Sequence, residues 1–115
     1  MADCLFCKIA QGAIPCRKVY EDEEVFAFHD IHPVAPVHFM LIPKLHLASL
    51  AEATFEQAAL LGRMLLLAAR LARQQGLENG FRTVINTGEG GGQEVFHLHI
   101  PVIGGGSIPP MVRRS

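Results

Sequence analysis

One stretch near the carboxyl end constrains the fold more than any other part of the chain. It runs from Gly92 to Gly105 and reads GQEVFHLHIPVIGG. Its many β-branched and aromatic residues predict a strand over 95–103. Alternate residues of a strand share one face, so His97 and His99 are expected to point the same way. Because imidazole can serve as nucleophile, proton carrier or metal ligand near neutral pH, this strand predicts a reactive or metal-binding site.

Other motifs accompany that stretch. They are Phe28-His29-Asp30-Ile31-His32-Pro33, Ala35-Pro36-Val37-His38, Leu41-Ile42-Pro43-Lys44-Leu45-His46, and Asn86 ahead of the glycine-rich loop. Together these segments resemble the histidine-triad (HIT) family, whose signature is His-x-His-x-His after a Gly-Gln-x-apolar-aromatic approach. The resemblance covers roughly residues 3 to 105. It implies a HIT-like α+β fold that forms a homodimer.

The remaining pattern predicts an α+β domain with a five-stranded antiparallel sheet, one short helix and one long helix. The expected strands are 18–20, 25–30, 38–43, 81–86 and 95–103. Residues 4–10 predict a short helix or turn. Thr54-x-x-Gln57 has the form of a capping box that begins the long helix, and Gly76 ends it. The 115 residues make a single domain, 1–115, in which 105–115 form a C-terminal tail.

The long helix is apolar around most of its circumference. The apolar positions are Phe55, Leu60, Leu61, Met64, Leu65, Leu66, Leu67 and Leu71. One sheet contact would not cover so wide a surface, so the helix is either deeply buried or packed on a second subunit. We favour the second subunit, because so small a domain has little other chain to bury the helix.

Composition excludes several function classes. A net charge of −1 argues against binding to a nucleic-acid polymer or an anionic membrane. The amino terminus lacks a secretory pattern, and the apolar segment 60–71 is interrupted by Gly62, Arg63 and Arg70, which argues against a membrane span. We therefore expect a cytoplasmic protein. Its three cysteines favour a metal or free thiols over a disulfide framework.

The resemblance assigns catalytic roles to three histidines. His99, the middle histidine of the signature, is the expected nucleophile. An imidazole nitrogen can attack phosphorus and hold a nucleotidyl group that water then removes. His97 belongs to the same signature, and His38 is expected to point toward this strand and orient His99.

The resemblance also implies a purine-nucleotide site for AMP or GMP. Asp30 matches the aspartate that binds the ribose hydroxyls, and Asn86 and Gln93 match residues that contact the phosphate. The glycine loop between them can bring backbone N–H groups near phosphate oxygens. The full expected set is Leu5, Phe6, Ile9, Phe28, Asp30, Ile31, Asn86, Gly92, Gln93, Glu94, Val95 and His99.

Cys4-x-x-Cys7 is the second distinctive motif. Alone it is ambiguous between zinc binding, redox exchange and chance, because a closed zinc site needs two more ligands. Some HIT proteins supply these from positions that match His46 and His97. We therefore predict a structural zinc ion held by Cys4, Cys7, His46 and His97.

Pro101 stands where the family has its third histidine. Proline has no titratable nitrogen and no backbone N–H, so the histidine's contact with phosphate or leaving group is lost and activity is expected to fall. A strand tolerates this proline if its nitrogen points away from a neighbouring strand. The sequence thus predicts a nucleoside phosphoramidase or related nucleotide hydrolase. The alternatives are a dinucleoside polyphosphate hydrolase and a catalytically weakened nucleotide-binding or regulatory scaffold.

Overall fold

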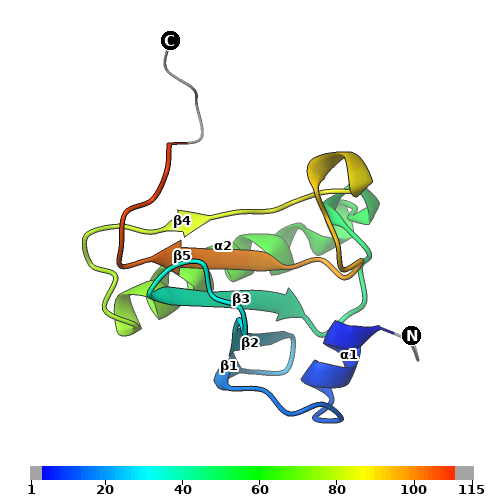
Figure 1. Ribbon diagram of the computed structural model, residues 1–115. Coiled ribbons are helices and arrows are strands. Elements are labelled where there is room, and N and C mark those ends of the chain that lie inside the picture. Colours follow the sequence, from blue (N-terminus) through cyan, green and yellow to red (C-terminus); the bar gives the residue numbers. More distant parts are fainter. Residues whose placement is uncertain (1–3, 111–115) are drawn as a thin grey trace.

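The computed structural model describes residues 4–110 and confirms the expected α+β architecture. Helices and strands follow in the order α1 (Leu5–Ala10), β1 (Lys18–Glu21), β2 (Val25–His29), β3 (Val37–Pro43), α2 (Ala58–Gln74), β4 (Arg82–Thr83) and β5 (Ile100–Gly104). Three short 3₁₀ turns are η1 (Leu50–Glu52), η2 (Phe55–Gln57) and η3 (Glu89–Gly91). The five strands form one antiparallel sheet in the order β1-β2-β3-β5-β4 (Figure 1).

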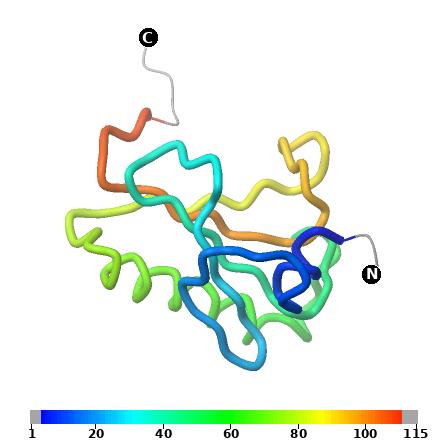
Figure 2. The backbone as a smooth tube through the Cα atoms, turned by 60° about the horizontal axis from the view of Figure 1, so that its bottom comes forward, coloured from blue at the N-terminus to red at the C-terminus, as the bar shows by residue number. Residues whose placement is uncertain are grey.

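The two faces of the sheet carry different layers. Helix α2 packs along one face, which we call the helix face, and α1 covers one end of the other, which we call the site face (Figures 1 and 2). Strand alternation sorts the residues: Phe39 and Leu41 of β3 belong to the core under α2, whereas Met40 and Ile42 pack with α1. Burying both apolar sets is what holds helix, sheet and α1 together.

The predicted ends of the long helix are confirmed. The Thr54 side chain accepts from the Glu56 N–H, and the Gln57 side chain accepts from the Thr54 N–H, which completes the capping box. The chain passes through η2 before becoming regular at Ala58. It leaves the helix at Gly76, whose φ of 90° is a conformation that glycine adopts without strain.

Two strands are shorter than the sequence predicts. Strand β5 begins at Ile100, five positions after the expected start at Val95, and β4 contains only Arg82 and Thr83. The Leu98 N–H donates to the Leu47 carbonyl at 2.7 Å, so this segment bonds to the connection after β3. The signature histidines therefore precede the regular strand.

Pro101 lies within β5 at a position that accommodates it. It is paired with Met40 of β3, and its carbonyl accepts from the Val84 N–H on the β4 side at 3.0 Å. In an antiparallel ladder the missing proline N–H would face the same side as this carbonyl. The proline nitrogen therefore faces the β4 side, where regular strand pairing has already ended at Thr83. Only one bond at the end of the edge strand is lost.

Within residues 4–110 no helix is long and apolar enough to cross a membrane. The proposed tail is described only as far as Pro110, and its last residues, 111–115, lie outside the described part. Before that point the guanidinium of Arg82 donates to the carbonyl of Pro109.

Candidate active site and metal-binding cluster

The four predicted metal ligands meet at the amino-terminal end of α1. Their ligand atoms all lie within 4.8 Å of one another. Cys4 is the N-cap of α1, and its sulfur accepts from the Cys7 N–H at 3.4 Å, which brings both thiols to one side of the first turn. His46 reaches them from the connection after β3, and His97 from the segment before β5.

Hydrogen bonding fixes which nitrogen of His97 faces the thiols. His97 is fully buried, and its Nε2–H donates to the Pro43 carbonyl at 2.7 Å. Burial lowers the pKa of His97, so the ring is neutral and Nδ1 carries the lone pair. Nδ1 lies 3.3 Å from the Cys4 sulfur and 3.5 Å from the Cys7 sulfur.

The donor set fits a tetrahedral metal ion. Nδ1 of His46 is 3.4 Å from the Cys7 sulfur. Thiolate and imidazole ligands of a tetrahedral zinc are separated by roughly 3.5 Å, given bond lengths of about 2.3 and 2.0 Å. Burial, together with the neighbouring Cys4, raises the pKa of the Cys7 thiol. A bound cation would favour the thiolate instead.

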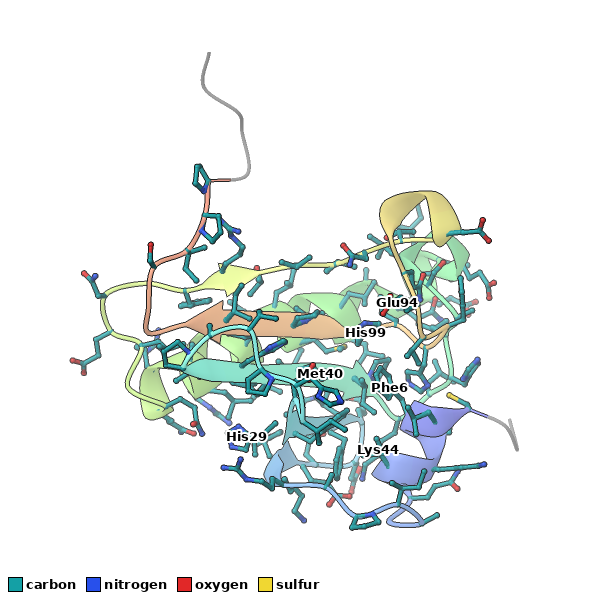
Figure 3. The ribbon with its side chains drawn as sticks, in the orientation of Figure 1. Phe6, His29, Met40, Lys44, Glu94 and His99 are labelled. Carbon is teal, nitrogen blue, oxygen red and sulfur yellow. The ribbon has the colours of Figure 1, made fainter. Side chains whose placement is uncertain are left out.

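His99 lies beside this cluster on the site face and is only partly buried. Its Nδ1–H donates to the His97 carbonyl at 2.8 Å, so in the neutral ring Nε2 carries the lone pair. The ring of Phe6 packs edge-on against it, with centroids 5.1 Å apart and planes at 87°. Phe6 also contacts His97, with centroids 6.1 Å apart, so both imidazoles pack against the same ring. Figure 3 shows Phe6 and His99 on this face.

His38 does not orient His99, and this prediction is wrong. The Val34 N–H donates to Nδ1 of His38 at 3.1 Å, so the proton of the neutral ring is on Nε2. That nitrogen lies 3.4 Å from Oδ2 of Asp30. The ring of His38 therefore lies against the Asp30 carboxylate, and the backbone carbonyl of His97 orients His99.

The side chain of Gln93 bonds within the protein, and its phosphate contact stays a prediction. It is buried, and its side-chain amide donates to the carbonyls of Ala48 at 2.7 Å and Val95 at 3.0 Å. Its amide oxygen accepts from the Gly88 N–H at 2.8 Å. Gly92, with φ of 84°, closes the turn immediately before it. Gln93 thus fixes the shape of the glycine loop from inside.

The other predicted nucleotide residues divide by exposure. Phe6, Ile9 and Phe28 are buried together on the site face, where the rings of Phe6 and Phe28 pack edge-to-face at 5.6 Å. The exposed or partly exposed members are Leu5, Asp30, Ile31, Asn86, Gly92, Glu94 and Val95. Figure 3 shows Glu94 and His99 on the same side of the molecule as Phe6.

One residue of this face was missed by the sequence reasoning. Met40 of β3 stands opposite Pro101, beside the ring cluster of Phe6 and Phe28. The period-2 alternation of β3 after His38 carried the signal, because Met40 is two positions along the same face. The Pro43 and His97 carbonyls, which fix the two imidazoles, leave no side-chain signal in a sequence.

Comparison with known proteins decides the family. The HIT domain model matches residues 11–108 of this chain. The chain belongs to the HIT family. Protein HitA of Neisseria gonorrhoeae is 56% identical over 104 residues, covering 90% of this chain and 97% of HitA. The purine nucleoside phosphoramidase of Escherichia coli K12 is 41% identical over 109 residues, covering 94% and 92%.

Solved structures agree with this assignment. A HIT family hydrolase from Legionella pneumophila superposes with a TM-score of 0.90 at 46% identity, covering 93% of this chain and 96% of that one. A histidine triad protein from Clostridium difficile gives a TM-score of 0.93 at 41% identity, covering 97% and 98%. The whole HIT fold is therefore present.

Proposed function

We propose that this HIT protein is a purine-nucleotide hydrolase. It releases AMP or GMP from nucleoside phosphoramidates or related conjugates through a nucleotidyl intermediate on His99. The kinship with a purine nucleoside phosphoramidase supports the substrate class. The observation that carries the proposal is the bond from Nδ1 of His99 to the His97 carbonyl, because it leaves the Nε2 lone pair ready to attack phosphorus.

The other residues bind the nucleotide. The carboxylate of Asp30, held by Nε2 of His38 and by the His32 N–H at 2.7 Å, is pre-positioned to accept from ribose hydroxyls. Phe6 and Phe28 offer an aromatic surface to a base. Four backbone N–H groups of the glycine loop already donate to oxygens of the same loop; they belong to Gly88, Gly91, Gly92 and Gln93. We therefore propose that phosphate binds to the backbone N–H groups of the next two residues, Glu94 and Val95.

The cluster of Cys4, Cys7, His46 and His97 is proposed to hold a structural zinc ion. When bound, zinc would tie α1 to the segment before β5 and so fix Phe6 beside His99. His97 is fully buried, so we assign it to the metal and to the His99 bond through its carbonyl, and not to contact with substrate.

A second copy of the chain is proposed to cover the outer side of α2. Leu66 of α2 and Phe55 of the preceding turn η2 are 76% and 99% exposed, and this exposed apolar surface supports the proposal of a homodimer. The rival functions are a dinucleoside polyphosphate hydrolase and a nucleotide-binding scaffold with little turnover. The absence of an imidazole at Pro101 favours the scaffold.

Substituting the nucleophile tests the hydrolase. His99→Ala should abolish turnover of AMP conjugates, because no other group can form the covalent intermediate, while AMP affinity stays within about threefold. His32→Ala is the matched control, since that side chain is exposed and only its backbone N–H contacts Asp30. Equal turnover by His99→Ala and the parent protein would reject the mechanism. AMP binding without turnover by the parent protein would support the scaffold.

A further inference from the structure

We propose that, among the nucleotide conjugates named above, this chain prefers those whose leaving group departs as an anion, such as a carboxylate or a phosphate, and that it turns over phosphoramidates, whose leaving group is an amine, more slowly. This inference rests on the proposed function and specifies its substrate class. It follows from where the protons of the site are held, and from Pro101.

The ring N–H group of each histidine near His99 already faces an oxygen atom of the protein. The Nε2–H of His97 is held by the Pro43 carbonyl inside the core, and that of His38 faces Asp30. The Nδ1–H of His99 donates to the His97 carbonyl. In the structure each of these three imidazole N–H groups therefore faces a protein oxygen and not open space beside Nε2 of His99.

Pro101 removes the remaining position on the same face. It has no proton to give, and its cross-strand partner is the buried thioether of Met40. On the β3 side Pro101 therefore has an apolar neighbour. An ionisable side chain does stand near His99: Glu94 is exposed on the loop that leads to it (Figure 3).

The chemistry of the two substrate classes differs at one step. Nε2 of His99 attacks the α-phosphorus, a P–N bond forms, and the bond from phosphorus to the leaving group breaks. A carboxylate or phosphate oxygen keeps that electron pair as a stable anion and needs no proton. An amide nitrogen must be protonated before or while it leaves as an amine. Water then attacks phosphorus, the P–N bond to His99 breaks with its electron pair returning to Nε2, and a proton passes to solvent.

General acid catalysis typically contributes about a hundredfold to ten-thousandfold in rate, which sets the expected size of the difference. The deficit should fall on amine conjugates alone. A nucleotide with an acidic leaving group needs only the nucleophile and the binding groups, and its turnover should not fall.

The test compares two conjugates in four proteins. The probes are the mixed anhydride of AMP with acetate and an N-alkyl phosphoramidate of AMP. The proteins are the parent chain, Pro101→His, Pro101→Ala and His99→Ala. Pro101→Ala restores the backbone N–H toward Val84 without an imidazole, so it separates repair of the strand from repair of the chemistry. His99→Ala gives the background rate for each probe, and AMP affinity shows that each variant keeps its site.

The expected result is a leaving-group-specific rescue. Pro101→His should raise kcat for the phosphoramidate by roughly a hundredfold or more and for the mixed anhydride by less than about tenfold, and Pro101→Ala should raise neither. Equal rescue of both probes, or efficient phosphoramidate turnover by the parent chain that falls in Glu94→Gln, would overturn the inference but leave the hydrolase intact. If the parent chain turns over neither probe above His99→Ala while binding AMP, the proposed hydrolase fails, and the inference with it.

Discussion

The two faces of the sheet are closed to different degrees. On the helix face, Phe39 and Val102 are fully buried under α2. On the site face α1 covers only one end, and His99 stays partly exposed beside it. A single strand such as β3 serves both faces through alternation, so one face supplies most of the stability while the other keeps polar groups accessible. Substitutions should therefore separate stability from chemistry.

The largest expected effect comes from breaking the cluster that fixes α1 to the site face. Cys7→Ser should abolish stoichiometric metal binding and lower the free energy of unfolding by roughly 5 kcal/mol or more, because structural metal binding contributes directly to folding. Metal analysis of chelator-free protein and urea unfolding measure both. Cys16→Ser is the matched control, because that thiol lies outside the cluster. Parent protein without metal, or equal losses in both variants, would contradict the site.

The helix face should respond in stability alone. Met64 is fully buried, so Met64→Ala should cost about 2–5 kcal/mol of unfolding free energy and leave AMP affinity unchanged. Leu66→Ala, on the exposed side of the same helix, should cost less than about 0.5 kcal/mol in dilute protein. If the proposed dimer forms there, the loss of unfolding free energy caused by Leu66→Ala should grow with protein concentration. Urea unfolding and sedimentation at several concentrations would show this. Equal costs at every concentration would contradict this division of α2.

The features that could be predicted from the sequence are those that depend on the pattern of side-chain types. The capping box at Thr54, the turn at Gly76 and the meeting of Cys4, Cys7, His46 and His97 were all foreseen. Periodicity, cap chemistry and resemblance each carried a direct signal for them. The sheet followed from alternation, although alternation did not show where regular pairing begins.

The sequence did not show which groups the side chains of His38 and Gln93 contact. The ring of His38 faces Asp30, and the Gln93 side chain donates to the carbonyls of Ala48 and Val95. Such choices depend on backbone N–H and carbonyl positions after folding. Sequence alone names the donors and acceptors but does not pair them.

The smallest effect is expected where α2 meets the turn between β1 and β2. The Asp22 carboxylate accepts from the N–H groups of Glu24 and Val25 at 2.8 and 2.9 Å and from the Tyr20 hydroxyl at 2.7 Å. It also pairs with Arg63 of α2. Burial raises the pKa of Asp22, but these hydrogen bonds outweigh it and hold the pKa far below its usual value.

This depressed pKa gives the prediction its sign. A carboxylate whose pKa is lower in the folded chain stabilises the fold above its unfolded pKa of about 3.9, and the stabilisation is lost as the pH falls below that value. Asp22→Asn should therefore cost about 1–3 kcal/mol at pH 7, and the gap to the parent protein should narrow between about pH 4 and pH 2. Urea unfolding across this range measures it. A gap that stays constant, or widens in acid, would show that the charge of Asp22 does not stabilise this junction. The site face should be unaffected at pH 7, since AMP affinity depends on residues across the sheet from α2.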